Sequence, residues 1–435
     1  MINVSSEWIQ ANAAMLVPIT TMECFIYDAR PGHSSEQEYT WTKDTIKRIE
    51  FGIHGDILSG TLPDYECIVE CDNILGENGL YVITDENRMR LAGAEFFLEY
   101  GYKNIAGKIQ YSLFIQNVDI NKDSNTVVFT LKTALSFMTT KYPDSILQTG
   151  TAYEVAESVF AQEYTNDYVP KPSGGADVYV LDESLNDYQI SLVDTNLSTA
   201  EILQVIANAC KCIIMVDFIG TIHILPRDTE MKSYSLSRQC QYSRPIESVD
   251  QPIRGCKFYC SGAVSGAAYP SGLSKGQWIE LTNQNLYADS GTTASAVAKW
   301  ASDELALNPK VFEVTVRYDP RLELFDVVQI QVGNEIHKAV VTDIKISYNG
   351  AWRGEIKLRD NGDGQLYTDD NFDVYNVMME YLAAVENGEG DYQPYAASYD
   401  DMVAYLEQHL NILYICDSDG EILTTSDGRM IVCGR

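Results

Sequence analysis

The sequence predicts a mainly β fold of the α+β class, and three observations support this prediction. Apolar and polar residues alternate with a period of two in many short runs, of which 312–317 is the clearest, and this alternation is typical of half-buried strands. Turn residues such as Asn349-Gly350 separate these runs, and Asn-Gly tolerates the positive φ of a tight hairpin. Helical spacing of apolar residues is confined to a few segments, such as 198–209.

Residues 1–120 are expected to form a first β-rich domain. Short strand-like runs follow one another at 22–29, 47–55, 66–72, 80–84, 94–101 and 108–118. Glycine, asparagine and aspartate turns separate these runs, and several short strands of this kind favour a barrel or a sandwich.

Residues 121–240 are expected to form an α+β domain, because helical spacing appears there. Thr151 is the expected N-cap of a helix at 151–162, with Glu154 as its capping-box partner. Ser198 and Glu201 form the same box at the start of a helix that reaches Ala209. The other expected elements are a strand at 127–131, a helical segment at 133–140, a loop at 166–187, and a hairpin whose strands at 212–216 and 221–225 flank a turn at 217–220.

Residues 241–360 are expected to form a second β domain. Its last part reads as an antiparallel meander of four strands at 312–317, 327–332, 337–347 and 353–359. Asp319-Pro320 separates the first two strands, because proline lacks the N–H that a central strand needs. The earlier elements are a strand pair at 242–250 and 253–261, a small polar excursion at 261–276, and a helix at 292–307.

Residues 361–435 form an acidic C-terminal extension. From position 360 on, the chain has sixteen acidic residues and only two basic ones. We expect two short helices, at 373–386 and 399–410, followed by a three-stranded β ribbon with Ser-Asp-Gly turns at 418–420 and 426–428. A ribbon this small cannot bury its apolar face alone, so we expect it to trimerise or to dock on a partner.

The overall composition argues against two classes of partner. The 435 residues include 62 acidic and 31 basic ones, so the net charge of −31 should repel nucleic acid and anionic lipid. We therefore expect no sequence-specific binding of nucleic acid. The first twenty residues lack the pattern of a secretory signal, and no apolar run reaches the roughly 18 residues of a membrane span. Synthesis in a cytoplasm is the expected default.

The cysteines and histidines predict no catalytic residue, no cofactor and no metal site. The close cysteine pairs lack a second pair at zinc-site spacing, so we expect buried free thiols; these pairs are Cys67 and Cys71, Cys210 and Cys212, and Cys256 and Cys260. Cys416 and Cys433 flank the C-terminal ribbon, but a cytoplasmic assembly route disfavours a disulfide. The five histidines are isolated, and no phosphate-binding loop or dinucleotide motif is present. We therefore expect that the chain is not an enzyme.

Three segments, in the same order along the chain, carry a family resemblance. Residues 46–73 contain Leu-Ser-Gly, Leu-Pro and Cys-Asp-Asn, 198–225 form a capped helix before a hairpin, and 311–359 contain Val-Val-Thr-Asp-Ile and Tyr-Asn-Gly-Ala-Trp-Arg-Gly. Together they resemble the tail hub proteins of tailed phages, over roughly residues 20–360. Two positions depart from the family pattern. Phe325 stands where many relatives have glycine, and Phe218-Ile219 interrupts a turn that is often Asp-x-Asp-Gly.

This resemblance implies a structural virion protein without enzymatic activity. It implies two tube-like β-barrels, from 1–120 and 241–360, with an α+β insertion at 121–240 and a small helix and ribbon extension at 361–435. A homotrimer of such chains would form the hub at the distal end of the tail tube in the virion. Its implied partners are a distal tail or tube protein, the tape-measure protein, and a central fibre or spike held by the extension.

Two other functions stay open for the extension. The C-terminal ribbon is also consistent with a receptor-binding element, which would make the chain an adhesin. A cell-wall hydrolase is the weaker alternative, because past residue 360 the only candidates for a Cys-His pair are His409, Cys416 and Cys433. The acid excess itself is expected to be a solvated tail; the alternatives are a docking surface for a basic partner, or repulsion that keeps packaged DNA from adhering.

Overall fold

The computed structural model describes most of the first 360 residues and two short segments beyond them. The described residues are 5–13, 20–27, 37–55, 62–75, 80–141, 146–165, 169–173, 177–191, 197–237, 240–249, 253–258, 267–269, 277–281, 295–301, 310–319, 321–333, 335–349, 352–360, 412–414 and 432–434. The chain divides into two compact units, one made of Met1–Leu273 with Gln277–Leu366, the other of Ser274–Gly276 with Tyr367–Arg435. No described helix is long and apolar enough to cross a membrane.

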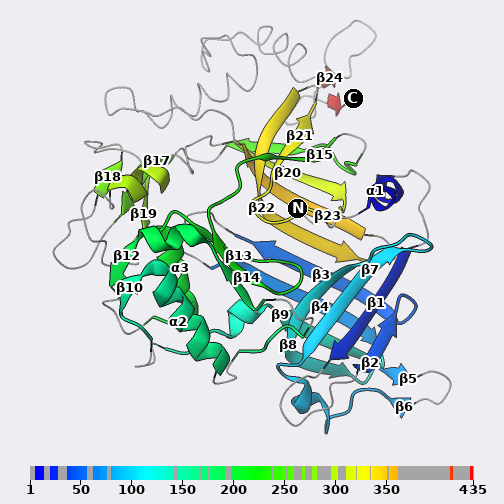
Figure 1. Ribbon diagram of the computed structural model, residues 1–435. Coiled ribbons are helices and arrows are strands. Elements are labelled where there is room, and N and C mark those ends of the chain that lie inside the picture. Colours follow the sequence, from blue (N-terminus) through cyan, green and yellow to red (C-terminus); the bar gives the residue numbers. More distant parts are fainter. Residues whose placement is uncertain are drawn as a thin grey trace, which may run out of the picture. The chain divides into compact units, whose positions relative to one another are not determined.

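A 13-stranded sheet organises the first unit (Figure 1). Its main path runs in the order β16-β20-β23-β22-β3-β4-β9-β8-β7-β1-β2, and β15 and β21 extend it beside β22. The strands are β1 (Thr20–Tyr27), β2 (Gln37–Thr42), β3 (Ile46–His54), β4 (Asp64–Asp72), β7 (Glu95–Tyr102), β8 (Ile109–Asn121), β9 (Thr126–Lys132), β15 (Met231–Leu236), β16 (Ile246–Val249), β20 (Lys310–Arg317), β21 (Val327–Val332), β22 (Glu335–Tyr348) and β23 (Trp352–Asp360). All pairs are antiparallel except β15 with β21.

The sheet contains the same five-strand arrangement twice. In chain order, the first repeat is β3, β4, β7, β8 and β9, and the second repeat is β16, β20, β21, β22 and β23. In each, the first strand pairs with the second, the second with the fifth, the fifth with the fourth, and the fourth with the third. The two repeats join where β22 of the second pairs with β3 of the first, which Figure 1 shows as yellow beside blue.

Bulges and backbone conformation follow the duplication. The long fourth strand has one extra residue against its neighbour in each repeat, Gln116 in β8 and Thr342 in β22. The carbonyl of the residue before each bulge accepts a backbone hydrogen bond from a residue with positive φ. That residue is Gly93 (φ 81°) in the first repeat and Phe325 (φ 67°) in the second. Phe325 therefore holds a left-handed conformation that glycine adopts at no steric cost.

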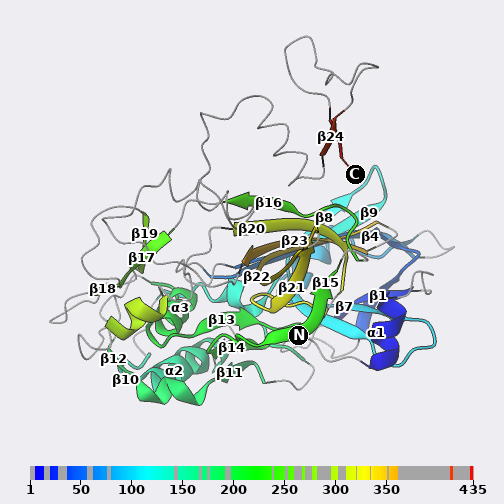
Figure 2. The same cartoon turned by 90° about the horizontal axis from the view of Figure 1, so that it is seen from above.

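The α+β part lies between the repeats in sequence. Its elements are η3 (Ala134–Phe137), β10 (Thr149–Thr151), α2 (Ala152–Thr165), β11 (Tyr179–Leu181), η4 (Glu183–Asp187), β12 (Gln189–Ser191), α3 (Thr199–Ala209), β13 (Ile213–Val216) and β14 (Ile222–Leu225). Figure 1 and Figure 2 both place β13 and β14 between the helices and the large sheet. Tyr65 Oη accepts a bond from Val216 N at 3.1 Å, and Ser112 N donates to Phe218 O at 2.9 Å, so the hairpin is fixed directly to β4 and β8.

The remaining described elements are short. They are α1 (Ser6–Ala13), β5 (Ile74–Leu75), β6 (Leu80–Tyr81), η2 (Arg88–Leu91), β17 (Ile253–Phe258), β18 (Ala267–Tyr269), β19 (Gln277–Leu281), the helical residues 295–301, and, in the second unit, β24 (Ile412–Tyr414) and β25 (Val432–Gly434). β24 and β25 pair antiparallel, as two strands of the expected ribbon would. The expected helices at 373–386 and 399–410 and the two Ser-Asp-Gly turns lie outside the described residues.

Several local predictions are confirmed. The fold is mainly β, and the predicted strands in 1–120 and 311–359 are present with shifted ends. Ser198 Oγ accepts from Glu201 N, and Glu201 Oε2 accepts from Ser198 N at 2.6 Å, which is the predicted capping box of α3. The hydrogen bonds from this box hold the pKa of the Glu201 carboxyl below its usual value. Thr151 and Glu154 make the same exchange at the start of α2.

Other predictions were wrong in their pairing. The four strands from 311 to 360 are not a meander, because β20 pairs with β23 and not with β21. The segment between β20 and β21 is buried, and the buried side chains of Asp319 and Arg321 brace it. The predicted strand pair at 242–250 and 253–261 is also absent: β16 pairs with β20, while β17 joins β18 and β19 in a separate sheet.

Two segments contain more order, or a tighter helix, than predicted. The expected loop at 166–187 includes β11, which pairs in parallel with β14, and the 3₁₀ helix η4 capped by Asp182. The helical segment at 133–140 is a single 3₁₀ turn, η3. The large sheet is an open path in the described residues, so the tube-like barrels are not seen as closed barrels in one chain.

Candidate interaction surface

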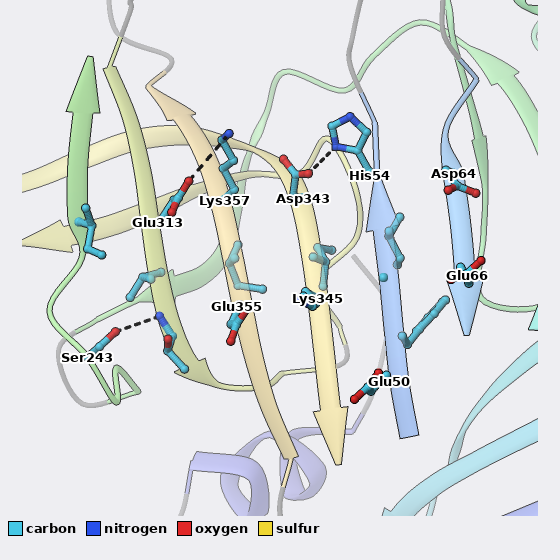
Figure 3. Close-up of a pocket in the computed structure, with 18 of the residues that line it drawn as sticks. Glu50, His54, Asp64, Glu66, Ser243, Glu313, Asp343, Lys345, Glu355 and Lys357 are labelled. Atoms are coloured by element: carbon cyan, nitrogen blue, oxygen red, sulfur yellow. Dashed lines mark hydrogen bonds and ion pairs between the residues drawn. The ribbon is translucent and has the colours of Figure 1, made fainter. Parts of the chain in front are cut away.

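A groove of about 560 Å³ crosses the large sheet on its solvent side. Side chains of β20, β23, β22, β3 and β4 line it, and the start of β16 and Ser243 close one end (Figure 3). Because side chains alternate along a strand, the charged residues of each strand lie on the groove face together with Ile68 and Ile246, and the buried apolar residues lie on the core face. The groove therefore spans the junction between the two repeats.

Strand register sets the charged residues of the groove in rows. One row runs across five strands as Glu313, Lys357, Asp343, His54 and Asp64, each directly opposite the next. Lys357 Nζ lies 3.9 Å from Glu313 Oε1, and the imidazole of His54 is hydrogen-bonded to the Asp343 carboxylate (Figure 3). Lys357 thus lies between the carboxylates of Glu313 and Asp343, which is a favourable arrangement for cross-strand neighbours.

A second row lies two residues further along each strand. It runs through Thr315, Glu355, Lys345, Gly52 and Glu66. Gly52 leaves a gap between Lys345 and Glu66, because a Cβ added there would meet no atom within 4 Å. At its end the Glu66 carboxylate lies 3.0 Å from Lys132 Nζ, which is also 3.0 Å from Asp64.

The groove has an excess of negative charge. Six carboxylates line it and only two lysine side chains do, Lys345 and Lys357. The carboxylates belong to Glu50, Asp64, Glu66, Glu313, Asp343 and Glu355. A concave surface with this balance attracts cationic groups and repels polyanions. Its exposed polar rows, with apolar Ile246 at one end, are typical of a contact surface.

Buried tyrosines and one ion pair hold the sheet behind the groove. Tyr111 and Tyr318, one from each repeat, lie with their hydroxyl oxygens 3.2 Å apart, and burial raises the pKa of both phenols. Arg321 donates to Asp319 through Nε at 2.9 Å and Nη2 at 2.5 Å. Tyr111 and Tyr318 thus join the two repeats through a buried contact, and the buried Arg321–Asp319 pair braces the segment after β20.

The end of β3 fits tightly against the second repeat. Gly55 donates its N–H to the carbonyl of the bulge residue Thr342 at 3.1 Å. A Cβ at Gly55 would come within 2.4 Å of Leu324 Cδ2 and 2.8 Å of Phe325 Cζ. The Phe325 ring that sequence comparison marked as a departure therefore packs where β3 meets β22.

The structure brings no cysteines or histidines into a chemical site among the described residues. Cys67 and Cys71 are buried free thiols on β4, and burial raises the pKa of both. Cys210, Cys212 and Cys256 are also buried and free. No described group of three or more His, Cys, Asp and Glu side chains could hold a metal. Cys260, Cys416, His33 and His409 lie outside the described residues.

The described histidines each contact a carboxylate. His223 Nε2 lies 2.9 Å from Asp217 Oδ2 in the turn of the β13–β14 hairpin, and His337 Nε2 lies 3.3 Å from Glu335. His54 belongs to the groove. Sequence reasoning missed the groove because its rows join three distant segments. The one signal was the alternation of charged residues in β3, β22 and β23, which marks a solvent face but not its neighbours.

Comparison with solved structures gives the class of fold. The structure is similar to a tail protein from Neisseria meningitidis MC58, with a TM-score of 0.52 and 12% identity, over 82% of this chain and 100% of that one. It is also similar to the 43 kDa tail protein of prophage MuSo2 from Shewanella oneidensis, with a TM-score of 0.52 and 10% identity, over 78% and 98%. No family model matches the sequence, and no curated protein does.

The fold is thus that of phage tail proteins, as the resemblance in the sequence implied. At these identities the likeness concerns the fold, and it covers the tail proteins over almost their whole length.

Proposed function

We propose that this chain is a structural protein of a phage-type tail and forms the trimeric hub at the distal end of the tail tube. The whole-length likeness to two tail proteins carries this proposal. The duplicated sheet supports it, because three chains with two repeats each supply six equivalent repeats, matching a ring of sixfold symmetry.

The groove has a role in this proposal. The concave, acidic face of the sheet is directed toward the axis of the ring, and the helices α2 and α3 lie on the side away from it. A negative inner wall keeps a passing polyanion such as DNA from binding, because like charges repel at short range. Each repeat then corresponds to one tube-like domain, with the barrel completed by neighbouring chains.

The partners follow from position in the tail. One face of the ring contacts the distal tail or tube protein, the interior receives the end of the tape-measure protein, and residues 361–435 carry the central fibre or spike. The chain resides in the virion, at the tail tip, after assembly in the cytoplasm of the host.

Solution mass tests the proposal. Light scattering of the purified 48.7 kDa chain, after size-exclusion chromatography, should give three times the monomer mass, and electron micrographs should show rings. A chain that is monomeric at every concentration, with no ring in images of particles, would overturn the hub.

Deleting residues 361–435 separates the hub from the adhesin. Loss of tail assembly supports a hub whose extension holds the tail tip together. Intact particles that no longer attach to cells support a receptor-binding extension instead. Zymography on purified cell wall tests the hydrolase, which predicts a cleared band at the mass of this chain.

A further inference from the structure

Among the strand edges of the first unit that lack a strand partner in the described residues, two resemble each other's counterparts in the internal junction, one on β16 and one on β8. β16 pairs with β20 on one side only. The second half of β8, residues 117–121, pairs with β9 on one side, while β7 reaches only as far as Phe114 on the other. An unpaired edge is a template for pairing with another chain.

The junction between the repeats shows what such an edge can bind. The corresponding half of β22, residues 343–348, pairs with β3 in an antiparallel ladder from Asp343–His54 to Tyr348–Ile49. In the duplication β8 corresponds to β22 and β16 corresponds to β3. Within the chain, the fourth strand of the second repeat is thus already paired with the first strand of the first repeat.

The registers give the correspondence residue by residue. The residue after the bulge is Asn117 in β8 and Asp343 in β22, so positions in these strand halves differ by 226. The second strands, β4 and β20, pair with the fifth strands, β9 and β23. When these pairs are followed outward from the bulge, Ile68 in β4 occupies the position that Glu313 occupies in β20. Ile68 faces Glu50 and Glu313 faces Ile246. Positions in β3 and β16 therefore differ by 196.

We propose that β8 of one chain pairs with β16 of the next chain in the register of the internal junction. Translating the pairs of β22 and β3 places Asp119 opposite Ser248, in the way that Lys345 lies opposite Gly52. The other pairs are Asn121 with Ile246, Ile120 with Glu247, and Val118 with Val249. This interface deepens the proposed hub and rests on that proposal for the number of chains.

The two edges are compatible in polarity and charge. Asn117, Asp119 and Asn121 are exposed on β8, whereas Val118 is buried and Ile120 half-buried. On β16, Ile246 and Ser248 are exposed, and the Glu247 side chain forms an ion pair with Lys310 at 3.0 Å. No like charges lie opposite each other in the translated register, and Ile246, with 66% of its surface exposed, gains a neighbour.

A paired-cysteine variant tests the register directly. In D119C/S248C six strands of the sheet separate the two new thiols within one chain, roughly 30 Å apart, so only different chains can link. Directly opposite residues are about 4.5–5.5 Å apart at Cα, within disulfide range. Oxidation should give linked dimers and trimers, with the 119–248 disulfide identified by peptide mass spectrometry.

Two controls accompany this variant. N121C/S248C moves one thiol two residues along, about 7–8 Å from its partner, and should link much less. The unmodified chain, oxidised in parallel, accounts for its own cysteines. A sample with trimeric mass and no 119–248 link overturns the edge pairing and leaves the hub standing. A sample that stays monomeric overturns both.

A charge test gives an independent readout. Ser248→Asp places a carboxylate opposite Asp119 and should weaken association about two- to fivefold per junction, and adding Asp119→Lys should restore it. Ser347→Asp puts the same charge opposite Glu50 in the internal junction and should leave association unchanged. Circular dichroism checks that each variant is folded. Equal association of the Ser248→Asp variant and the unmodified chain would contradict the proposal.

Discussion

The two repeats share one strand arrangement but have different side chains at the positions where the backbone or the packing is most constrained. At the residue with positive φ, the first repeat uses Gly93, whereas the second uses Phe325, whose ring is buried against Gly55. At the start of the third strand, the first repeat has the buried carboxylate of Glu95, and the second has Val327 in the same register. The two repeats therefore keep the same order of strand pairing, whereas their side chains differ according to the residues that pack against each repeat.

The largest expected difference lies in the segment that leads into the third strand. In the second repeat Asp319 and Arg321 form a buried, bidentate ion pair, so Asp319→Ala should lower the free energy of unfolding by about 3–5 kcal/mol. Arg48→Ala removes ion pairs of the half-exposed Arg48 side chain with Glu50 and Glu70 and should cost less than about 1 kcal/mol. Urea unfolding measures both; equal losses would show that the second repeat does not depend on its buried pair.

The next difference concerns two neighbouring glycines, Gly52 in β3 and Gly55 directly after it. Gly55→Ala forces a Cβ against Leu324 and Phe325 and should destabilise the chain by about 1–3 kcal/mol. Gly52→Ala, in open space in the groove, is the matched control and should be neutral or slightly stabilising. Thermal unfolding of the two variants compares them. If Gly55→Ala were as stable as Gly52→Ala, the close fit of the junction would be disproved.

Backbone strain distinguishes the repeats by a smaller amount. Gly93→Ala puts a Cβ on a residue at φ 81° and should cost about 1–2 kcal/mol. The second repeat already carries that strain at Phe325, offset by burial of the ring. Denaturant titration of Gly93→Ala gives the number, and a value near zero would mean that the left-handed position tolerates side chains in both repeats.

The subtlest difference is a dependence on pH. Burial raises the pKa of the Glu95 carboxyl, although Ser112 Oγ and Ser173 N donate hydrogen bonds to it. Its contribution to stability is therefore complete below the unfolded pKa of about 4.3 and is lost as pH rises through the raised folded value. Unfolding free energies of the unmodified chain and Glu95→Gln, measured across this range, should converge or cross. Parallel curves would show that Glu95 titrates normally.

Local chemistry made some of this fold predictable. The capping boxes at Thr151 and Ser198 are short-range signals, and both are formed as predicted. The alternation of apolar and polar residues predicted the strands of both repeats but not which strands pair. Alternation shows only which face of a strand is buried and does not determine its neighbour. The pairing of β20 with β23 depends on the buried Asp319 segment, a tertiary feature.

Neither the groove nor the duplication could be predicted from the sequence, for a related reason. Corresponding residues are chemically unrelated, as Glu95 and Val327 or Ile68 and Glu313 illustrate, so the repeats share register without sharing side chains. The groove unites rows from β3 (Ile46–His54) with rows from β20 (Lys310–Arg317) and β22 (Glu335–Tyr348), which lie far along the chain from β3. Only the known pairing order reveals either feature.

The junction between β22 and β3 has a further consequence, because it joins two different surfaces. A contact of this kind has a direction and cannot be completed by two chains facing each other. Each added chain presents a new free end, so growth stops only if the rotation per step brings the last end back to the first; otherwise a filament results. If β8 and β16 of neighbouring chains repeat this junction, the bends at the two bulges, Thr342 within a chain and Gln116 between chains, set how many chains close the ring.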